Sequence, residues 1–216
     1  MSLHSLVAAA TDVLPVPEEA AAVARRRERL VARARGRVLE IGASGGRNLA
    51  HYQSDAVEMV VVLAPKAARR GRLMERIASA PVCVEVHEAV AEEVLFEDGW
   101  FDTVISTLAL CSVADVSSTL ASISRLLRPD GSLLLLEHVG VAGVVGGLQR
   151  LVTPVWHRVG GCRLDRDLIG AVRAGGFALT DVDRFNVVGG GLAPATWVEA
   201  VAKPKAPSGT TDTPVL

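Results

Sequence analysis

Residues 37–48 read RVLEIGASGGRN, and this stretch decides the fold. An apolar strand ends in an acidic residue, Glu40, and a tight loop of small residues then leads directly into a helix. Glycine has no Cβ and accepts positive φ, so such a loop lets a ligand approach the backbone. The helix start offers free N–H groups, and the acid can hold a hydroxyl or an ammonium group. The stretch therefore predicts a nucleoside-cofactor pocket at the carboxyl end of a parallel strand.

The spacing inside this loop selects among cofactor classes. A dinucleotide-binding G-x-G-x-x-G pattern starting at Gly42 needs glycine at two positions that are occupied by Ser44 and Arg47. The residues instead fit E-x-G-x-[G/S]-x-G, which begins at Glu40 and ends at Gly46. This pattern resembles motif I of the class I S-adenosylmethionine-dependent methyltransferases.

The composition limits what kind of protein this is. The 216 residues are 50% hydrophobic and carry a formal net charge of −1, which indicates one domain with a sizeable core and argues against a nucleic-acid binder. No apolar run reaches about 18 residues, so stable membrane insertion is not expected. The first ten residues lack the basic start of a signal peptide. The three cysteines are scattered, which predicts free thiols in a reducing cytoplasm. The sequence has no C-x-x-C or H-x-x-x-H spacing, so a metal site is not expected.

Apolar runs alternate with helical patterns along most of the chain. Strands are expected at residues 38–41, 57–63, 82–86, 101–107 and 132–138, followed by a terminal strand pair at 177–185 and 196–203. Helices are expected at residues 17–35, 46–52, 66–79, 117–127 and 166–175, with a turn at 128–131. This alternation predicts an α/β fold with a doubly wound, mainly parallel sheet and helices on both faces.

Further segments extend the resemblance to the methyltransferase-type-11 branch, which includes the methyltransferase-like 7 thiol methyltransferases and relatives that methylate quinones or phospholipids. They are residues 91–98, 101–113, 126–138 and 156–167. The resemblance implies a Rossmann-like methyltransferase fold with seven strands, the last of them antiparallel. It also implies S-adenosylmethionine as the cofactor and a small, apolar acceptor such as a thiol, a quinone or phenol, or a lipid-like molecule. The oligomeric state stays open.

The expected domain organisation follows from the extent of this resemblance. Residues 1–36 form an N-terminal helical segment, residues 37–203 the methyltransferase domain, and residues 204–216 a disordered tail rich in Pro, Ser and Thr. Arginines between positions 25 and 35 load the end of the first helix. They are interpreted as a solvated face with a favourable helix dipole, rather than as a phosphate or membrane site.

The resemblance also assigns a cofactor site. Glu40 is expected to contact the amino group of the methionine moiety, Ala91 and Glu92 to line the adenine pocket, and Ser106 and Thr107 to lie under the methionine end. The full expected set of cofactor-binding residues is Glu40, Gly42, Ala43, Ser44, Gly46, Asn48, Ala64, Ala91, Glu92, Ser106 and Thr107.

Two positions depart from the family pattern. The second strand usually ends in an acid that binds both ribose hydroxyls, but Ala64 follows it here, and Val90 replaces an acid that binds the adenine amino group. Each lost charge-assisted hydrogen bond costs about 1.5–3 kcal/mol. A second hypothesis is therefore a degenerate methyltransferase-fold protein with lost or altered cofactor binding, acting as a binding or scaffold partner.

The acceptor side offers several candidates, each with two interpretations. His138, after the fifth strand, is a candidate catalytic base or acceptor-positioning group, and equally a structural histidine. His157 and Cys162 are candidate substrate contacts or packing residues, whereas Cys111 is interpreted as a buried, inert thiol. The glycine-rich segment 139–152 is either a lid over an apolar acceptor or a buried crossover helix, and its low charge is compatible with transient membrane contact.

Overall fold

A single sheet organises the computed structural model, which describes residues 20–43, 45–65, 70–187 and 195–205. Its strand order is β3-β2-β1-β4-β5-β7-β6. The strands are β1 (Gly36–Ile41), β2 (Val57–Leu63), β3 (Cys83–His87), β4 (Phe101–Thr107), β5 (Leu127–Val139), β6 (Phe177–Asn186) and β7 (Thr196–Pro204). All neighbouring pairs from β3 to β5 are parallel, whereas β7 runs antiparallel to both β5 and β6. The predicted doubly wound, mainly parallel sheet with an antiparallel last strand is confirmed.

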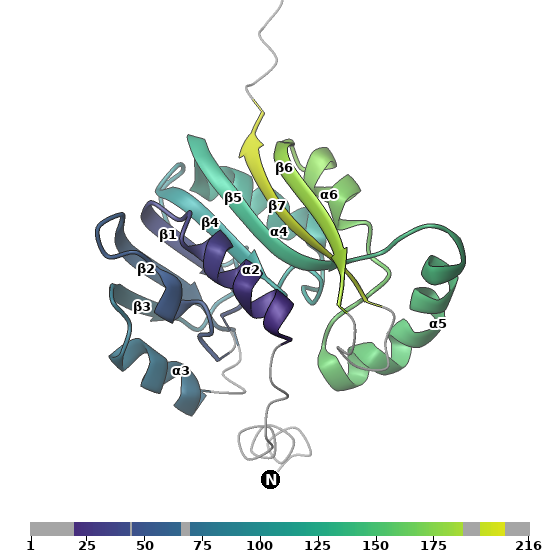
Figure 1. Ribbon diagram of the computed structural model, residues 1–216. Coiled ribbons are helices and arrows are strands. Elements are labelled where there is room, and N and C mark those ends of the chain that lie inside the picture. The colour runs from purple at the N-terminus through teal and green to yellow at the C-terminus, as the bar shows by residue number, and fades with distance from the viewer. Residues whose placement is uncertain (1–19, 44, 66–69, 188–194, 206–216) are drawn as a thin grey trace, which may run out of the picture.

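Helices cover both faces of this sheet (Figure 1). Within the described residues they are α2 (Ala21–Val31), the 3₁₀ turn η1 (Leu49–His51), α3 (Arg70–Ala78), α4 (Val116–Leu126), α5 (Gly143–Gly160) and α6 (Leu168–Ala174). Side chains of α2, η1 and α3 join one buried cluster, and those of α4 and α6 join the other. Helix α5 lies to one side of the main body, at the right of Figure 1.

The pleat of the strands divides their side chains between the two buried clusters. In β1, Val38 packs in the cluster on the α2 side, whereas Leu39 and Ile41 pack in the cluster on the α4 side. Successive side chains of a strand alternate between faces, so Glu40 shares the α2 face with Val38. The chain winds from β1 toward β2 on one side and toward β4 on the other, which creates the switch point where such sheets bind ligands.

Several predicted boundaries need correction. The helix predicted over 46–52 is only the 3₁₀ turn η1, and the helix predicted over 17–35 ends at Val31, its start lying outside the described residues. The helix predicted over 66–79 is described from Arg70 onward. The strand predicted over 82–86 is shifted by one residue to Cys83–His87.

The turn predicted at residues 128–131 lies inside β5. That strand begins at Leu127, directly after α4, and its pairing with β4 is irregular at this point. Phe101 pairs with Leu127 and Thr103 with Ser132, so the turn-forming residues bulge out of the ladder instead of reversing the chain. The Pro and Gly in this segment therefore mark a bulge.

Candidate active site

The glycine loop closes the carboxyl end of β1. Gly42 and Gly46 have φ of +66° and +70°, a region that favours glycine. A Cβ on Gly42 would lie 2.9 Å from the Cβ of Ala109, so the loop after β4 packs directly on this position. Ala43 donates its backbone N–H to the Leu63 carbonyl at 3.3 Å, which joins the loop to the end of β2. Ser44 lies outside the described residues.

Glu40 belongs to a buried polar group on the α2 face of the sheet. Tyr52 donates its hydroxyl to Glu40 Oε2 at 2.7 Å. Beside it, Arg27 Nη1 donates to Asn48 Oδ1 at 2.5 Å and to Thr107 Oγ1 at 2.9 Å, and Asn48 Nδ2 donates to the same hydroxyl at 3.0 Å. Three predicted site residues, Glu40, Asn48 and Thr107, therefore come together at the ends of β1 and β4.

Burial sets the charge of Glu40. Removal from water raises its pKa to about 7, although the hydrogen bond from Tyr52 and the charge of Arg27 favour the carboxylate. Glu40 thus changes charge close to neutral pH. A carboxyl group poised in this way gains most when a cation, such as an ammonium group, arrives beside it.

The solvated face predicted for the arginines between positions 25 and 35 holds for Arg25, Arg29, Arg33 and Arg35, which are exposed, but not for Arg26 and Arg27. Arg27 is 4% exposed and lies inside the polar group just described. Arg26 contacts Asp183 of β6 at 2.6 Å and Glu199 of β7 at 2.8 Å. Its guanidinium also lies 3.8 Å from the centre of the Phe185 ring. Helix α2 is therefore anchored to the sheet through charged residues, and one of them reaches the site.

A second buried polar group lies on the α4 face. Glu137 Oε1 accepts hydrogen bonds from Ser106 Oγ at 2.6 Å and from the backbone N–H groups of Ala109 and Leu110 at 3.0 Å. Oε2 accepts from the backbone N–H of Cys111 at 3.1 Å. The carboxylate thereby holds the loop after β4 in place. Its burial raises the pKa of Glu137, and these hydrogen bonds oppose that effect.

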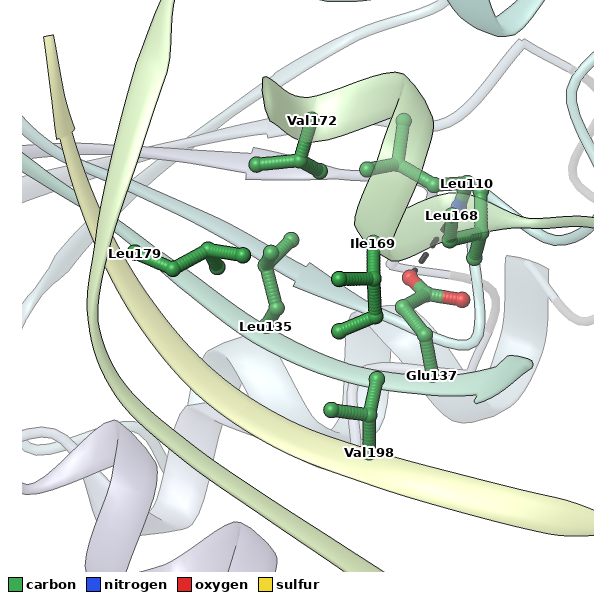
Figure 2. A pocket seen from close by; sticks show the side chains of 8 residues that line it. All are labelled: Leu110, Leu135, Glu137, Leu168, Ile169, Val172, Leu179 and Val198. Carbon is green, nitrogen blue, oxygen red and sulfur yellow. Dashed lines mark hydrogen bonds between the residues drawn. The ribbon is translucent and has the colours of Figure 1, made fainter. Parts of the chain in front are cut away.

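A small apolar pocket adjoins this carboxylate (Figure 2). Its lining is Leu110, Leu135, Glu137, Leu168, Ile169, Val172, Leu179 and Val198. In Figure 2 the Glu137 carboxylate turns toward the backbone of Leu110. Residues of α6, β6 and β7 enclose this pocket. It is therefore a small cavity in the hydrophobic core and not the nucleoside pocket.

The predicted adenine-side residues lie elsewhere. Ala64 is 4% exposed, and its backbone N–H donates to the His87 carbonyl at 2.9 Å, tying β2 to β3. Ala91 is buried in the core. Glu92 is exposed, and its Oε1 accepts a hydrogen bond from Thr119 of α4 at 2.6 Å. The structure does not bring these three residues into either polar group.

Of the three residues predicted for the acceptor side, His138 and Cys162 meet, and Cys111 lies beside them. His138, Cys162 and Cys111 are 6%, 9% and 0% exposed, respectively. His138 Nδ1 lies 3.9 Å from Cys111 Sγ, and its ring centre lies 4.1 Å from that of Trp197. The hydrogen bond from Cys111 and the contact with His138 lower the pKa of the Cys162 thiol to about 4, whereas the pKa of Cys111 is raised. His157 is exposed and contacts the Gly161 carbonyl at 2.9 Å through its ring, so it ends α5 and does not join this cluster.

The segment 139–152 is not a buried crossover helix, and its role as a lid stays a prediction. From Gly143 onward it belongs to α5, whose inward face carries Gln149 and Thr153, at 0% and 4% exposure. Gln149 accepts from the Val141 backbone N–H at 2.9 Å and donates to the Val139 carbonyl at 3.0 Å. The helix is therefore buried on a polar face and exposed on an apolar one.

Comparisons with known proteins agree with this geometry. A family model described as a methyltransferase domain matches residues 39–135, which include the glycine loop and the carboxyl ends of β1 and β4. This match and the relatives described next support a class I S-adenosylmethionine-dependent methyltransferase. Human thiol S-methyltransferase TMT1A, a relative, is 28% identical over 166 residues. The rat thiol S-methyltransferase TMT1B is 38% identical over 73 residues.

These relatives are only partly matched. The aligned segments cover 74% and 32% of this chain but 65% and 30% of the two relatives, so the chain spans less than two thirds of either. The solved structure of Burkholderia thailandensis 1,6-didemethyltoxoflavin-N1-methyltransferase, with bound 1,6-didemethyltoxoflavin and S-adenosylhomocysteine, has a TM-score of 0.63 at 20% identity. That match covers 94% of this chain and 85% of the other. It shows a shared fold.

The residues present fit the methionine half of the family's cofactor better than the nucleoside half. Glu40 supplies a buried carboxylate, and a side chain on Gly42 would fill the space between the glycine loop and Ala109. At the end of β2, Ala64 offers no side-chain acceptor for a ribose. Sequence reasoning missed Arg27, Tyr52 and Glu137. Only Glu137 carried a readable signal, an acid at the end of an apolar strand.

Proposed function

We propose that this protein transfers a methyl group from S-adenosylmethionine to a small, apolar acceptor. The observation that carries the proposal is the buried carboxylate of Glu40 beneath the glycine loop at the switch point of the sheet. A buried, hydrogen-bonded acid in this place suits the ammonium group of the methionine moiety. The match to a methyltransferase domain and the similarity to thiol, quinone and phospholipid methyltransferases support the reaction class.

The chain's own residues have a limited task in this reaction. When bound, S-adenosylmethionine supplies a methyl group that is already activated by the sulfonium. Glu40 would hold the amino acid end, the backbone of Gly42 and Ala43 would support it from below, and Thr107 would border the methyl side. Alignment of the acceptor with the methyl group then supplies much of the rate. A base is needed only when the acceptor carries its proton at neutral pH.

The similarity to thiol S-methyltransferases favours a thiol over an alcohol as the acceptor. A thiol ionises near neutral pH, and a neighbouring cation or metal ion lowers its pKa further. We expect methyl transfer to a small alkyl thiol, measured with labelled S-adenosylmethionine, to exceed transfer to the matched alcohol by at least about 100-fold. A phenol of similar size serves as a third acceptor. Methylation of the phenol or alcohol at the rate of the thiol would contradict this assignment.

Helix α5 presents an apolar stripe that suits a lipid surface. Val144, Leu148, Leu151 and Val155 recur at helical spacing, with 91%, 47%, 74% and 67% of their surface exposed. The helix contains no acidic residue, and Arg150 and Arg158 are exposed beside the stripe. No helix in the described part of the chain is long and apolar enough to cross a membrane. We infer transient contact of α5 with an anionic bilayer surface, which would bring an apolar acceptor to the site.

The free cysteines support a reducing compartment such as the cytoplasm.

Vesicle binding tests the role of α5. We expect the protein to sediment with phosphatidylcholine vesicles that contain phosphatidylserine and to bind less tightly to phosphatidylcholine alone. Leu151→Asp should weaken binding by at least about tenfold, because a buried leucine contributes about 1.5–3 kcal/mol. Leu95→Asp is the control, since Leu95 is 100% exposed and lies between β3 and β4, outside α5. Equal loss in both variants, or dimerisation through the stripe without lipid, would contradict the inference.

A further inference from the structure

Three metal-binding side chains meet outside the cofactor loop. Cys111 follows β4, His138 lies near the end of β5, and Cys162 follows α5. One ligand atom from each lies within 4.8 Å of the others, and all three residues are buried. A tetrahedral zinc ion with Zn–S bonds of about 2.3 Å requires sulfurs about 3.8 Å apart. Small side-chain rotations are therefore sufficient to close the cluster around an ion.

The backbone holds these residues next to one another. Arg163 donates its N–H to the Cys111 carbonyl at 2.9 Å, which fixes Cys162 beside Cys111. The Glu137 carboxylate accepts a hydrogen bond from the backbone N–H of Cys111 and so fixes Cys111 in place. Glu137 directly precedes His138 in β5. Contacts of this kind orient metal ligands before the ion arrives. The proximity of the cluster is thus a property of three packed elements and does not depend on one flexible side chain.

The surroundings also suit bound thiolates. Ser112 donates its hydroxyl to Cys162 Sγ at 3.4 Å, and the same oxygen lies 3.6 Å from Cys111 Sγ. The His138 ring packs on Trp197, which limits its rotation. Two thiolates and a neutral imidazole balance the charge of one divalent ion, so the loaded site carries no net charge into a buried environment.

We propose that Cys111, His138 and Cys162 form a zinc site. Sulfur and imidazole ligands in a tetrahedral arrangement favour Zn²⁺ over the oxygen-seeking cations Mg²⁺ and Ca²⁺. Three protein ligands leave the fourth position open, as in zinc sites that bind substrate. The ligand class that fits this position is a small thiol, because zinc removes the proton of a coordinated thiol.

The open position connects the metal to the acceptor, and this connection rests on the proposed function. A thiol bound there loses its proton to solvent. Its sulfur then forms a bond to the methyl carbon as the bond from that carbon to the sulfonium breaks. The products are a thioether and S-adenosylhomocysteine, and the zinc ion keeps its charge and its three protein ligands. The site thus supplies the deprotonation that a thiol acceptor needs.

Cobalt substitution tests the site without any methyl transfer. Protein treated with EDTA and kept reduced with a phosphine receives one equivalent of Co²⁺. We expect sulfur-to-cobalt charge-transfer absorption together with the visible bands of four-coordinate cobalt, both removed by Zn²⁺. Cys83→Ser is the matched control because Cys83 is exposed on β3, and it should bind cobalt like the wild type. Cys162→Ser and His138→Ala should each weaken binding by more than about tenfold.

The open position is tested by adding 2-mercaptoethanol to the cobalt protein. A further rise in charge-transfer absorption, absent with ethylene glycol, is expected. Wild-type protein without charge-transfer absorption would overturn the site, as would equal absorption in Cys162→Ser, and both readings hold even if a variant folds poorly. No response to 2-mercaptoethanol would overturn the open position. Cofactor binding by metal-free protein is measured separately, so failure of the proposed function and failure of the zinc site are distinguished.

Discussion

Glu40→Gln is expected to weaken S-adenosylmethionine binding by about 10- to 150-fold, the equivalent of one charge-assisted hydrogen bond of about 1.5–3 kcal/mol. Glutamine keeps the shape of the side chain and its contact with Tyr52 but cannot pair with an ammonium group. Calorimetric titration of both proteins at the same pH measures the ratio. An unchanged affinity would remove Glu40 from the cofactor site.

The pH dependence of this difference tests the same residue. Burial raises the pKa of Glu40 to about 7, so below that pH the carboxyl group is neutral and must release a proton to hold a cation. Wild-type affinity should therefore fall as the pH drops below about 7, by up to tenfold per pH unit, while Glu40→Gln lacks this component. The free energy of unfolding of both proteins is the control, because it shows whether the substitution damages the fold. Ionised Glu40 lowers stability as the pH rises through about 7, so Glu40→Gln should be at least as stable as the wild type at pH 8.

A substitution at the end of β2 should act in the opposite direction. Ala64→Asp restores the acid that the family uses for the ribose, and we expect tighter binding of the cofactor by about tenfold or more. The gain should be smaller for methionine itself, because methionine lacks the ribose that the introduced carboxylate would bind in the cofactor. Weaker binding in Ala64→Asp than in the wild type would show that the nucleoside half takes another path.

Glu137→Ala is expected to reduce the free energy of unfolding by about 3–6 kcal/mol. The alanine removes the acceptor of the Ala109 and Cys111 N–H groups and of the Ser106 hydroxyl, whereas the Leu110 N–H keeps Ser106 Oγ at 3.2 Å. Each unsatisfied buried group costs about 1–3 kcal/mol. Urea unfolding followed by circular dichroism measures the loss. The loop after β4 contains Leu108 at φ +56°, so it depends on these bonds to keep its shape.

Glu92→Ala provides the matched control for that experiment. Its carboxylate also accepts a hydroxyl hydrogen bond at 2.6 Å, from Thr119, but Glu92 is exposed. The buried Thr119 hydroxyl keeps the Asp115 carbonyl as an acceptor at 2.8 Å, so the expected loss is below about 1 kcal/mol. Equal effects of the two substitutions would contradict the role given to Glu137.

The fold was largely predictable from the sequence, for physical reasons. Strands buried on both faces are rich in continuous apolar runs, and residues 60–63 of β2 and 133–136 of β5 are such runs. Local turn signals were less reliable. Pro and Gly at residues 128–131 indicated a chain reversal, but the strand pairing of β4 and β5 continues beyond them and converts the turn into a bulge.

The site was predictable only where one short stretch carries it. Glu40, Gly42 and Gly46 could be found because a strand, a loop and a helix start follow one another in the sequence. Arg27 could not, because a buried arginine in a row of arginines differs from its neighbours only through tertiary packing. The same limit applies to the proposed zinc site. Its ligands come singly from three elements, so no spacing rule could predict it.

The most direct test of the central claim is calorimetric titration of the wild-type protein with S-adenosylhomocysteine at pH 8, together with its thermal unfolding. We predict saturable one-to-one binding and a rise in melting temperature with ligand concentration, because a ligand that binds only the folded state stabilises it. Absence of both binding heat and a thermal shift at about 1 mM ligand, a concentration that detects even weak sites, would contradict the account.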